Sequence, residues 1–304
     1  MSIKNYKAAA ALAIFCTLLW GTAFPFIKVG YAQFGIEGND IGSKLLFAGA
    51  RFTLAGIMVL FIFLVKNKHL PKIEKNGIMP VMLLGSVQTF GQYIFTYIGI
   101  GFTSGANTSV ITACATFFTV LFAPLFFKSD KLNICKIIGC VLGFCGVLCV
   151  NSGGGVTVDT LFGDFMILMS TLSAAGNFIS KGIVRDREPI SVTGFQLLFG
   201  GILLLIAGFV TGGKLDFSSI KALLVLLWLA FVSAAAFAIW TALLKHHPAS
   251  RICVFNLLVP VFGTLLSGIM LGESVFGIET IVSVVLICAG IFISNMQIKK
   301  RCER

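Results

Sequence analysis

Ten apolar stretches divide the chain, and each is about as long as one helical crossing of a lipid bilayer. A hydrocarbon core of ~30 Å requires ~20 helical residues. The stretches are separated by short polar segments and occur at Ala8–Gly30, Leu45–Val65, Ile78–Gly99, Thr103–Phe127, Asn133–Asn151, Leu161–Gly182, Ser191–Thr211, Lys221–Leu244, Ala249–Leu271 and Phe276–Gln297. Charged residues make up only 12% of the sequence, too few to cover a water-exposed surface. The sequence predicts an all-α integral membrane protein with ten transmembrane helices.

The basic residues are distributed unequally between the two sides of the predicted membrane domain. With the amino terminus placed in the cytoplasm, 18 of the 23 Lys and Arg residues fall on the cytoplasmic side. Such a bias in short loops fixes orientation, so we expect a multi-pass protein of the plasma (inner) membrane with both termini cytoplasmic. The lipid bilayer is the predicted partner of this charge. Nucleic acid is not expected, because the basic residues are spread over many loops without forming a patch.

Two segments about 143 residues apart have the same pattern. Residues Ser104–Leu132 and His247–Val275 each combine a turn of small residues, an apolar helix and a polar segment with one acid, Asp130 or Glu273. Each copy lies in a half of five spans, and an odd number of crossings makes the second half enter from the opposite side. The sequence therefore predicts two inverted five-helix repeats, 1–151 and 161–304, joined by a glycine-rich outer linker at 152–160.

Several short motifs follow one another in a fixed order along the whole chain. They are Trp20, Gly21 and Thr22; Arg51, Phe52, Ala55 and Gly56; Thr103, Ser104, Gly105 and Ala106; Pro248, Ala249 and Ser250; Pro260; and Leu271, Gly272 and Glu273. With these motifs the chain resembles the drug/metabolite transporter superfamily, in its EamA-type ten-helix branch. Phe117 and the pair Ser129 and Asp130 depart from the family pattern, which usually has a proline and a glutamate there. The resemblance implies a carrier and favours export over uptake.

Polar residues recur at helical spacing on six of the ten spans. Because polar groups in lipid usually face a cavity or another helix, we expect the first, third, fourth, sixth, eighth and ninth spans to surround a central pathway. The resemblance implies the same inner set. The predicted substrate-binding residues are Trp20, Phe24, Gln88, Gln92, Ser109, Thr112, Ser173, Asn177, Trp240 and Asn256. Close helix packing is the alternative for the Ser and Thr residues and for both Trp residues, and it stays open.

Three further groups of residues are candidates for motion, charge and association. Pro260 removes a backbone hydrogen bond, and we group it with Gly21 and Gly263 as hinge or gating residues. The charges expected at the outer mouth are Lys28, Arg51, Asp164 and Glu273. Gly139 and Gly143 form a GxxxG pattern, which is typical either of packing within the chain or of a homodimer contact, and both interpretations stay open.

All 12 acidic residues lie in loops or near the ends of the spans. We therefore expect a largely uncharged, aromatic-lined pathway for a small-molecule substrate such as an amino acid or a related amphipathic solute. The expected mechanism is alternating access. Neither a metal site nor a cofactor is expected, because the three histidines lie in loops and the cysteines lack CxxC spacing. A flippase of a lipid-linked molecule is the alternative. A channel is not favoured, because the sequence shows no selectivity filter. A membrane-embedded enzyme would need catalytic pairs that the spans do not show.

Overall fold

Helices account for all the regular secondary structure in the part of the chain that the structure describes. This computed structural model describes residues 3–103, 108, 111–112, 114–126, 132–149, 158–271 and 278–295. The elements are α1 (Tyr6–Gln33), α2 (Ile41–Asn67), α3 (Lys75–Leu84), η1 (Gly85–Gly91), α4 (Gln92–Gly99), α6 (Cys114–Phe126), α7 (Ile134–Cys149), α8 (Val158–Thr171), η2 (Leu172–Ala174), α9 (Ala175–Val184), α10 (Pro189–Val210), α11 (Ile220–His246), α12 (Ala249–Ile252), η3 (Cys253–Leu257), α13 (Leu258–Leu271) and α14 (Ile278–Asn295). The prediction of an all-α fold is confirmed.

Within the described residues, seven helical segments are long and apolar enough to cross a membrane, judged by length and composition. They are Tyr6–Gln33, Ile41–Asn67, Lys75–Gly99, Leu161–Val184, Pro189–Val210, Ile220–His246 and Ala249–Leu271. Shorter apolar helices lie at Ile134–Gly146 and Val285–Ser294, and α6 occupies about half of the predicted fourth span. The described helices are consistent with ten spans in the predicted order.

The helices begin where the local sequence supplies a cap for the first free N–H groups. The Asp40 side chain accepts a hydrogen bond from the backbone N–H of Ser43 at 2.9 Å, which starts α2. Glu188 caps α10 in the same way, and Pro189 follows at the first helical position, where its missing N–H costs nothing. These polar caps stand at the edges of apolar sequence, so they set where these two spans begin.

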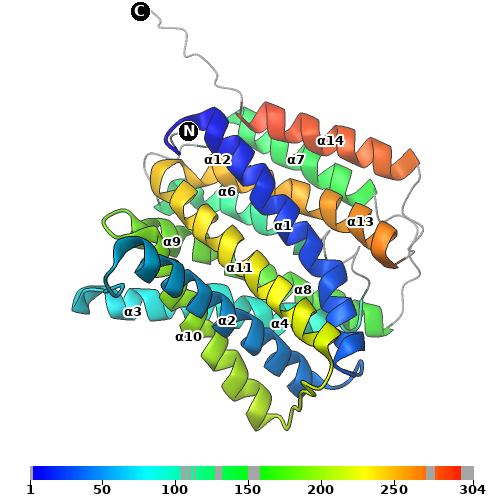
Figure 1. Cartoon of the computed structure of the whole chain (residues 1–304). Helices are drawn as coiled ribbons and strands as arrows, with labels where there is room; N and C mark the ends of the chain where they lie inside the picture. Colours follow the sequence, from blue (N-terminus) through cyan, green and yellow to red (C-terminus); the bar gives the residue numbers. More distant parts are fainter. Residues whose placement is uncertain are drawn as a thin grey trace, which may run out of the picture.

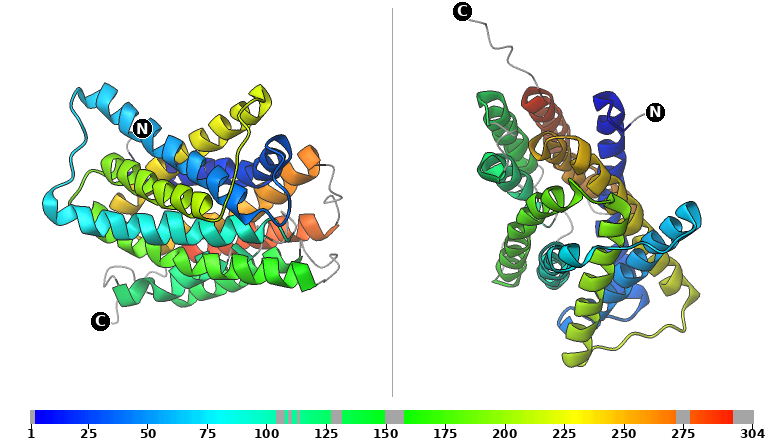
Figure 2. Two further views of the ribbon diagram at one scale, coloured as in Figure 1. Left: turned by 90° about the horizontal axis from the view of Figure 1, so that it is seen from below. Right: turned by 90° about the vertical axis from the view of Figure 1, so that its left-hand side faces the viewer.

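The helices form two flanking pairs with the remaining helices between them. Figure 1 shows α7 and α14 side by side on one flank and α2 and α10 together on the other, and both pairs are in extensive contact. The second view in Figure 2 shows the same separation. The contacts repeat when the first five spans are exchanged with the last five: α1 packs on α13 as α6 packs on α9, and α1 packs on α11 as α4 packs on α8. This exchange is the signature of a two-fold repeat.

Glycines at intervals of seven residues bring α2 and α10 into close contact. On α10 the residues Leu198 and Leu205 face glycines of α2, and on α2 the residues Leu46 and Leu60 face glycines of α10. A Cβ built on any of these glycines would lie within 3 Å of the opposite helix or, at Gly42, of the turn that follows α10, so small residues allow the backbones to approach. The glycines are Gly42, Gly49 and Gly56 on α2 and Gly194, Gly201 and Gly208 on α10.

Substituting Gly56→Ala is expected to destabilise the protein. The new Cβ would meet the backbone N of Leu198 at 2.5 Å and its Cα at 2.8 Å, and a backbone cannot move aside as a flexible side chain can. Overpacking of this kind costs about 1–3 kcal/mol. Thermal unfolding in detergent should show a clear fall in Tm. Gly182→Ala on α9 is the matched control, because nothing lies within 4 Å of its Cβ position; an equal fall for both variants would contradict the packing argument.

The GxxxG pattern on α7 is used for packing within the chain. A Cβ at Gly139 would lie 2.4 Å from the backbone oxygen of Gly290 on α14, and a Cβ at Gly143 would lie 2.5 Å from the Leu257 side chain. Both glycines therefore allow close contact with other helices of the same molecule. The homodimer stays a prediction, and it would need a different surface from this one.

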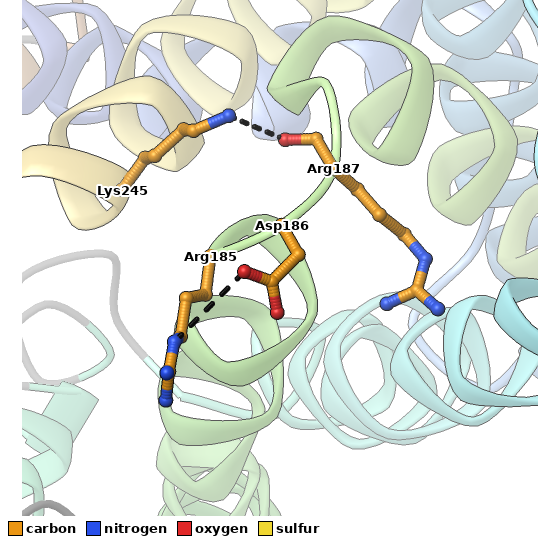
Figure 3. Close-up of polar contacts among 4 residues, drawn as sticks. All are labelled: Arg185, Asp186, Arg187 and Lys245. Atoms are coloured by element: carbon orange, nitrogen blue, oxygen red, sulfur yellow. Dashed lines mark hydrogen bonds and ion pairs between the residues drawn. The ribbon is translucent and has the colours of Figure 1, made fainter.

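Basic side chains cross-link one end of the bundle. Lys245 near the end of α11 donates from Nζ to the carbonyl of Arg187, which lies between α9 and α10, at 2.7 Å (Figure 3). Arg185 and Asp186 in the same connection form an exposed ion pair of 3.9 Å, a kind that contributes little to stability. The starts of α1 and α10 and the end of α14 lie at this end (Figure 1). The sequence assigns this end to the cytoplasm, and that orientation stays a prediction.

Candidate functional site

A cavity of about 120 Å³ lies between the two halves of the chain. Its walls come from the six spans that the sequence predicts to be the inner set, with one additional residue from α2. The lining residues are Trp20, Ala23, Phe24, Ile27, Arg51, Gln88, Gln92, Tyr93, Thr96, Thr112, Ala115, Ser173, Asn177, Phe237, Trp240, Asn256, Val259 and Pro260. A water molecule occupies ~10–15 Å³ on this measure, so the space matches roughly ten waters or one small solute.

The structure brings most of the predicted substrate-binding residues together. Those that line the cavity are Trp20, Phe24, Gln88, Gln92, Thr112, Ser173, Asn177, Trp240 and Asn256. Ser109 lies outside the described residues. The sequence analysis did not select Tyr93, Thr96 or Phe237 for the site, although each lies one helical turn or less from a residue that it did select.

Three spans are interrupted where they meet the cavity. The third span contains the π-helical segment η1 with Gln88, the sixth contains the 3₁₀ segment η2 with Ser173, and the ninth contains the 3₁₀ segment η3 with Asn256. In lipid, such irregular backbone is tolerated where it is buried in protein or lines a cavity. Broken helices around a central cavity are typical of carriers, which use the freed backbone groups for binding.

A chain of polar side chains crosses the wall between the third, sixth, seventh and eighth spans. Gln196 on α10 donates from Nε2 to Gln88 Oε1 at 3.2 Å, and Gln88 Nε2 makes a longer contact of 3.5 Å with Asn177 Oδ1. Trp240 Nε1 donates to the same Asn177 oxygen at 3.4 Å. Gln196 is fully buried, so it lies behind the cavity and holds Gln88 in place. The chain fixes three lining residues and orients their remaining polar atoms.

Aromatic rings form a continuous second wall. The ring of Trp20 meets that of Trp240 edge-on at 5.0 Å between centroids and that of Phe237 at 5.6 Å. Phe237 in turn lies 6.5 Å from both Tyr93 and Phe52. Such edge contacts add to the stabilisation from area burial alone. The wall therefore presents a rigid apolar surface to the cavity.

Two polar atoms in the lining are enclosed without a partner. The indole N–H of Trp20 and the amide oxygen Oδ1 of Asn256 make no hydrogen bond to any described residue. Buried polar groups of native proteins are nearly always paired, so an orphan that borders a cavity is a candidate for binding a ligand. One of these atoms is a donor and the other an acceptor.

Pro260 and the two glycines predicted as hinges gather at one helix contact. Pro260 lies in the first turn of α13, directly after η3, and has no N–H to offer the carbonyl of Asn256 four residues earlier. Gly21 packs against α13: a Cβ there would lie 2.5 Å from Phe262 Cβ and 3.1 Å from the backbone N of Gly263. The close contact of α1 with α13 thus sits beside the break in the ninth span. A hinge at this contact stays a prediction.

The four charges predicted at the outer mouth stay a prediction as a group, and the structure describes three of them. Asp164 accepts a hydrogen bond of 2.6 Å from Thr103 Oγ1, and Lys28 is half-buried on α1. Glu273 lies outside the described residues. The Arg51 side chain is 1% exposed and lines the cavity, so it already has a place in the candidate site. Among the lining residues Arg51 is the single charged one.

Within the described ranges, no three His, Cys, Asp or Glu side chains come together in a way that would hold a metal ion. The cavity wall contains amide, hydroxyl, indole and guanidinium groups, which bind ligands by hydrogen bonding. Groups of these kinds are able to bind an organic solute.

Comparison of the sequence with known proteins finds membrane transporters. The sequence profile of the EamA-like transporter family matches residues 7–152 and again residues 161–296. The uncharacterized transporter YoaV of Bacillus subtilis is 26% identical over 291 residues, which cover 94% of this chain and 96% of YoaV. A protein of Salmonella typhimurium named "Probable amino-acid metabolite efflux pump" is 28% identical over 300 residues, covering 93% of each chain.

The uncharacterized inner membrane transporter YedA of Escherichia coli is 25% identical over 282 residues, which cover 91% of this chain and 87% of YedA. A solved structure, described only as "Crystal structure of protein", superposes with a TM-score of 0.76 at 18% identity and covers 95% of this chain and 96% of its own. At that identity the likeness shows the fold alone.

Proposed function

Because the chain belongs to the EamA-like transporter family, we propose that it carries a small amphipathic metabolite out of the cell by alternating access. The observation that supports the proposal is the cavity, which is enclosed by three spans from each half and contains most of the side chains predicted to bind substrate. A site between two related halves is where rocking of one half against the other exposes it to each side in turn.

The substrate class follows from the size and chemistry of the lining. A cavity of about 120 Å³ matches an amino acid or a related organic solute. The aromatic wall suits an apolar side chain, and the amides suit its polar groups. The relative from Salmonella typhimurium, named as a probable amino-acid metabolite efflux pump, supports the same class and the outward direction. The flippase alternative requires a lipid-linked cargo that this space does not favour.

The chain is a multi-pass membrane protein, and the remaining features of the proposal concern its arrangement in the membrane. We infer two repeats, 1–151 and 161–304, linked by 152–160, with both termini in the cytoplasm and the protein in the plasma membrane. The named inner-membrane relative YedA and the excess of basic residues on one side support this arrangement. Labelling of a cysteine introduced at each terminus, with a reagent that cannot cross the membrane, tests it.

Changing both Gln92 and Asn256 to Ala is expected to lower transport at least tenfold. Each amide contributes about 1 kcal/mol through a hydrogen bond to the solute, and ~1.4 kcal/mol is a tenfold change in affinity. A thermal-shift screen of amino acids, nucleosides and organic cations first identifies a stabilising solute. Counterflow of that labelled solute in proteoliposomes then compares the variants.

The matched control is the double variant Thr22→Ala and Ser86→Ala. Both hydroxyls bond only to backbone carbonyls one turn earlier, at Leu19 and Met82, and neither lines the cavity. Transport should survive in this control. Undiminished counterflow in the Gln92 and Asn256 variant would contradict the proposed site, and transport of a lipid-linked molecule in place of a solute would favour the flippase.

A further inference from the structure

The cavity contains a buried positive charge without a negative partner in the described part of the chain. The Arg51 side chain is 1% exposed, yet it forms no ion pair with a described residue, and none of the described lining residues is acidic. The guanidinium of an arginine carries a positive charge and offers only hydrogen-bond donors. Charges inside membrane spans are costly and usually mark a functional pathway.

Neutral groups hold one side of the guanidinium. Arg51 Nε donates to Ser233 Oγ at 2.9 Å and to the Leu229 carbonyl at 3.2 Å, and Nη1 donates to Tyr97 Oη at 2.9 Å. The ring of Phe52 lies 4.9 Å from the guanidinium carbon. These contacts orient the group and leave its net charge uncompensated.

The other side of the guanidinium is available to a ligand. Nη2 has no hydrogen-bond partner among the described residues, while Arg51 is part of the cavity lining. A side chain already fixed by three hydrogen bonds loses little rotamer freedom when it binds, and its planar fork matches the two oxygens of a carboxylate.

We propose that Arg51 binds the carboxylate of the carried solute and so selects monocarboxylates, including α-amino acids, over their uncharged analogues. This inference rests on the proposed carrier function and adds to it the charge of the substrate. One guanidinium in a cavity without acids balances one negative charge. The unpartnered Asn256 Oδ1 then accepts a hydrogen bond from a second group of the solute, such as an ammonium.

The rival explanation is that Arg51 only ties α2 to α11 and α4 through Ser233, Leu229 and Tyr97. A tie of this kind predicts a loss of stability when Arg51 is changed, but no preference between ligands of different charge. The two explanations are therefore separated by ligand selectivity.

The test compares each carboxylate with its own amide in purified protein. The probes are acetate with acetamide, benzoate with benzamide, and leucine with leucinamide, and the signal is tryptophan fluorescence. Only three tryptophans are present, and Trp20 and Trp240 line the cavity, so a Trp228→Phe background reports on the cavity alone. We expect saturable changes with at least one carboxylate, with affinity about 10- to 100-fold above that for its amide.

Three variants complete the experiment. Arg51→Gln should remove the preference, Arg51→Lys should keep part of it because the charge remains, and Arg185→Gln should leave it unchanged because that side chain is 83% exposed at one end of the bundle. The comparison of carboxylate with amide needs only the unmodified Arg51, so it decides the matter even if Arg51→Gln fails to fold.

The outcomes separate this inference from the carrier function. The proposal is overturned if no carboxylate binds better than its amide, or if Arg51→Gln keeps the preference. Counterflow of an uncharged solute that is unaffected by Arg51→Gln would leave the carrier function standing and remove the carboxylate site. Carboxylate binding without transport by the reconstituted protein would leave the carboxylate site standing and remove the carrier function.

Discussion

Replacing Gln88 by Leu is expected to destabilise the protein strongly and to stop transport. The substitution leaves Gln196 Nε2 without its acceptor and takes one donor from Asn177 Oδ1. Gln196 is fully buried, and an unsatisfied buried polar group costs about 1–3 kcal/mol. Lipid cannot replace the partner that the fully buried Gln196 loses. Thermal unfolding measures the first effect and proteoliposome counterflow the second.

Removing both partners should restore much of the stability but not the transport. In the double variant Gln88→Leu and Gln196→Leu no orphaned amide remains at that contact, and replacing both partners by apolar groups is often nearly neutral. Ser86→Leu is the control within the same π-helical segment, because Ser86 bonds only to the Met82 carbonyl. If the double variant were as unstable as the sum of the single variants, the two amides would not be coupled.

The sequence could predict the inner set of helices because amide side chains are so restricted in lipid. Gln88, Gln92, Asn177 and Asn256 come from three spans, and a shared polar volume is the simplest way to accommodate them. The structure has them around one cavity. The pattern does not predict which solute these amides bind, because an amide is both donor and acceptor and fits many solutes.

The depth of Arg51 within the second span could not be predicted from the sequence for a different reason. The apolar stretch begins at Leu45, so Arg51 lies within two turns of the predicted end of the second span. A charge at that position is expected at the outer mouth. The helix begins at Ile41, capped by Asp40, so the arginine lies about one turn deeper than the apolar pattern indicates. Tyr97 is not part of the polar stripes, yet its hydroxyl accepts a hydrogen bond that helps to fix the arginine.

The breaks in the third, sixth and ninth spans also could not be predicted from periodicity. The π-helical η1 contains no proline, and its geometry depends on the close approach of α10: a Cβ at Gly85 would meet the Gln196 carbonyl at 2.8 Å. Tertiary packing therefore decides the local backbone there. Pro260 marked the ninth span correctly as irregular, but the 3₁₀ segment precedes it at Cys253–Leu257.

Trp20→Phe is expected to lower transport several-fold while leaving the fold intact. The change keeps a ring against Trp240 and Phe237 and removes the indole N–H, which is enclosed and has no partner among the described residues. If that N–H donates to the solute, its loss removes about 1 kcal/mol of binding, or roughly a five-fold change in affinity. Thermal unfolding should show no loss of stability, because an unsatisfied donor has been removed.

Trp20→Ala is expected to have the larger effect, because it opens the aromatic wall. Removal of a packed tryptophan destabilises proteins by up to about 3–5 kcal/mol, and here it also enlarges the space that holds the solute. Trp228→Phe is the matched control, since its indole N–H is likewise enclosed and unpartnered but lies away from the cavity. Equal transport in Trp20→Phe and Trp228→Phe, with transport lost in Trp20→Ala, would assign Trp20 a steric role and exclude the hydrogen bond.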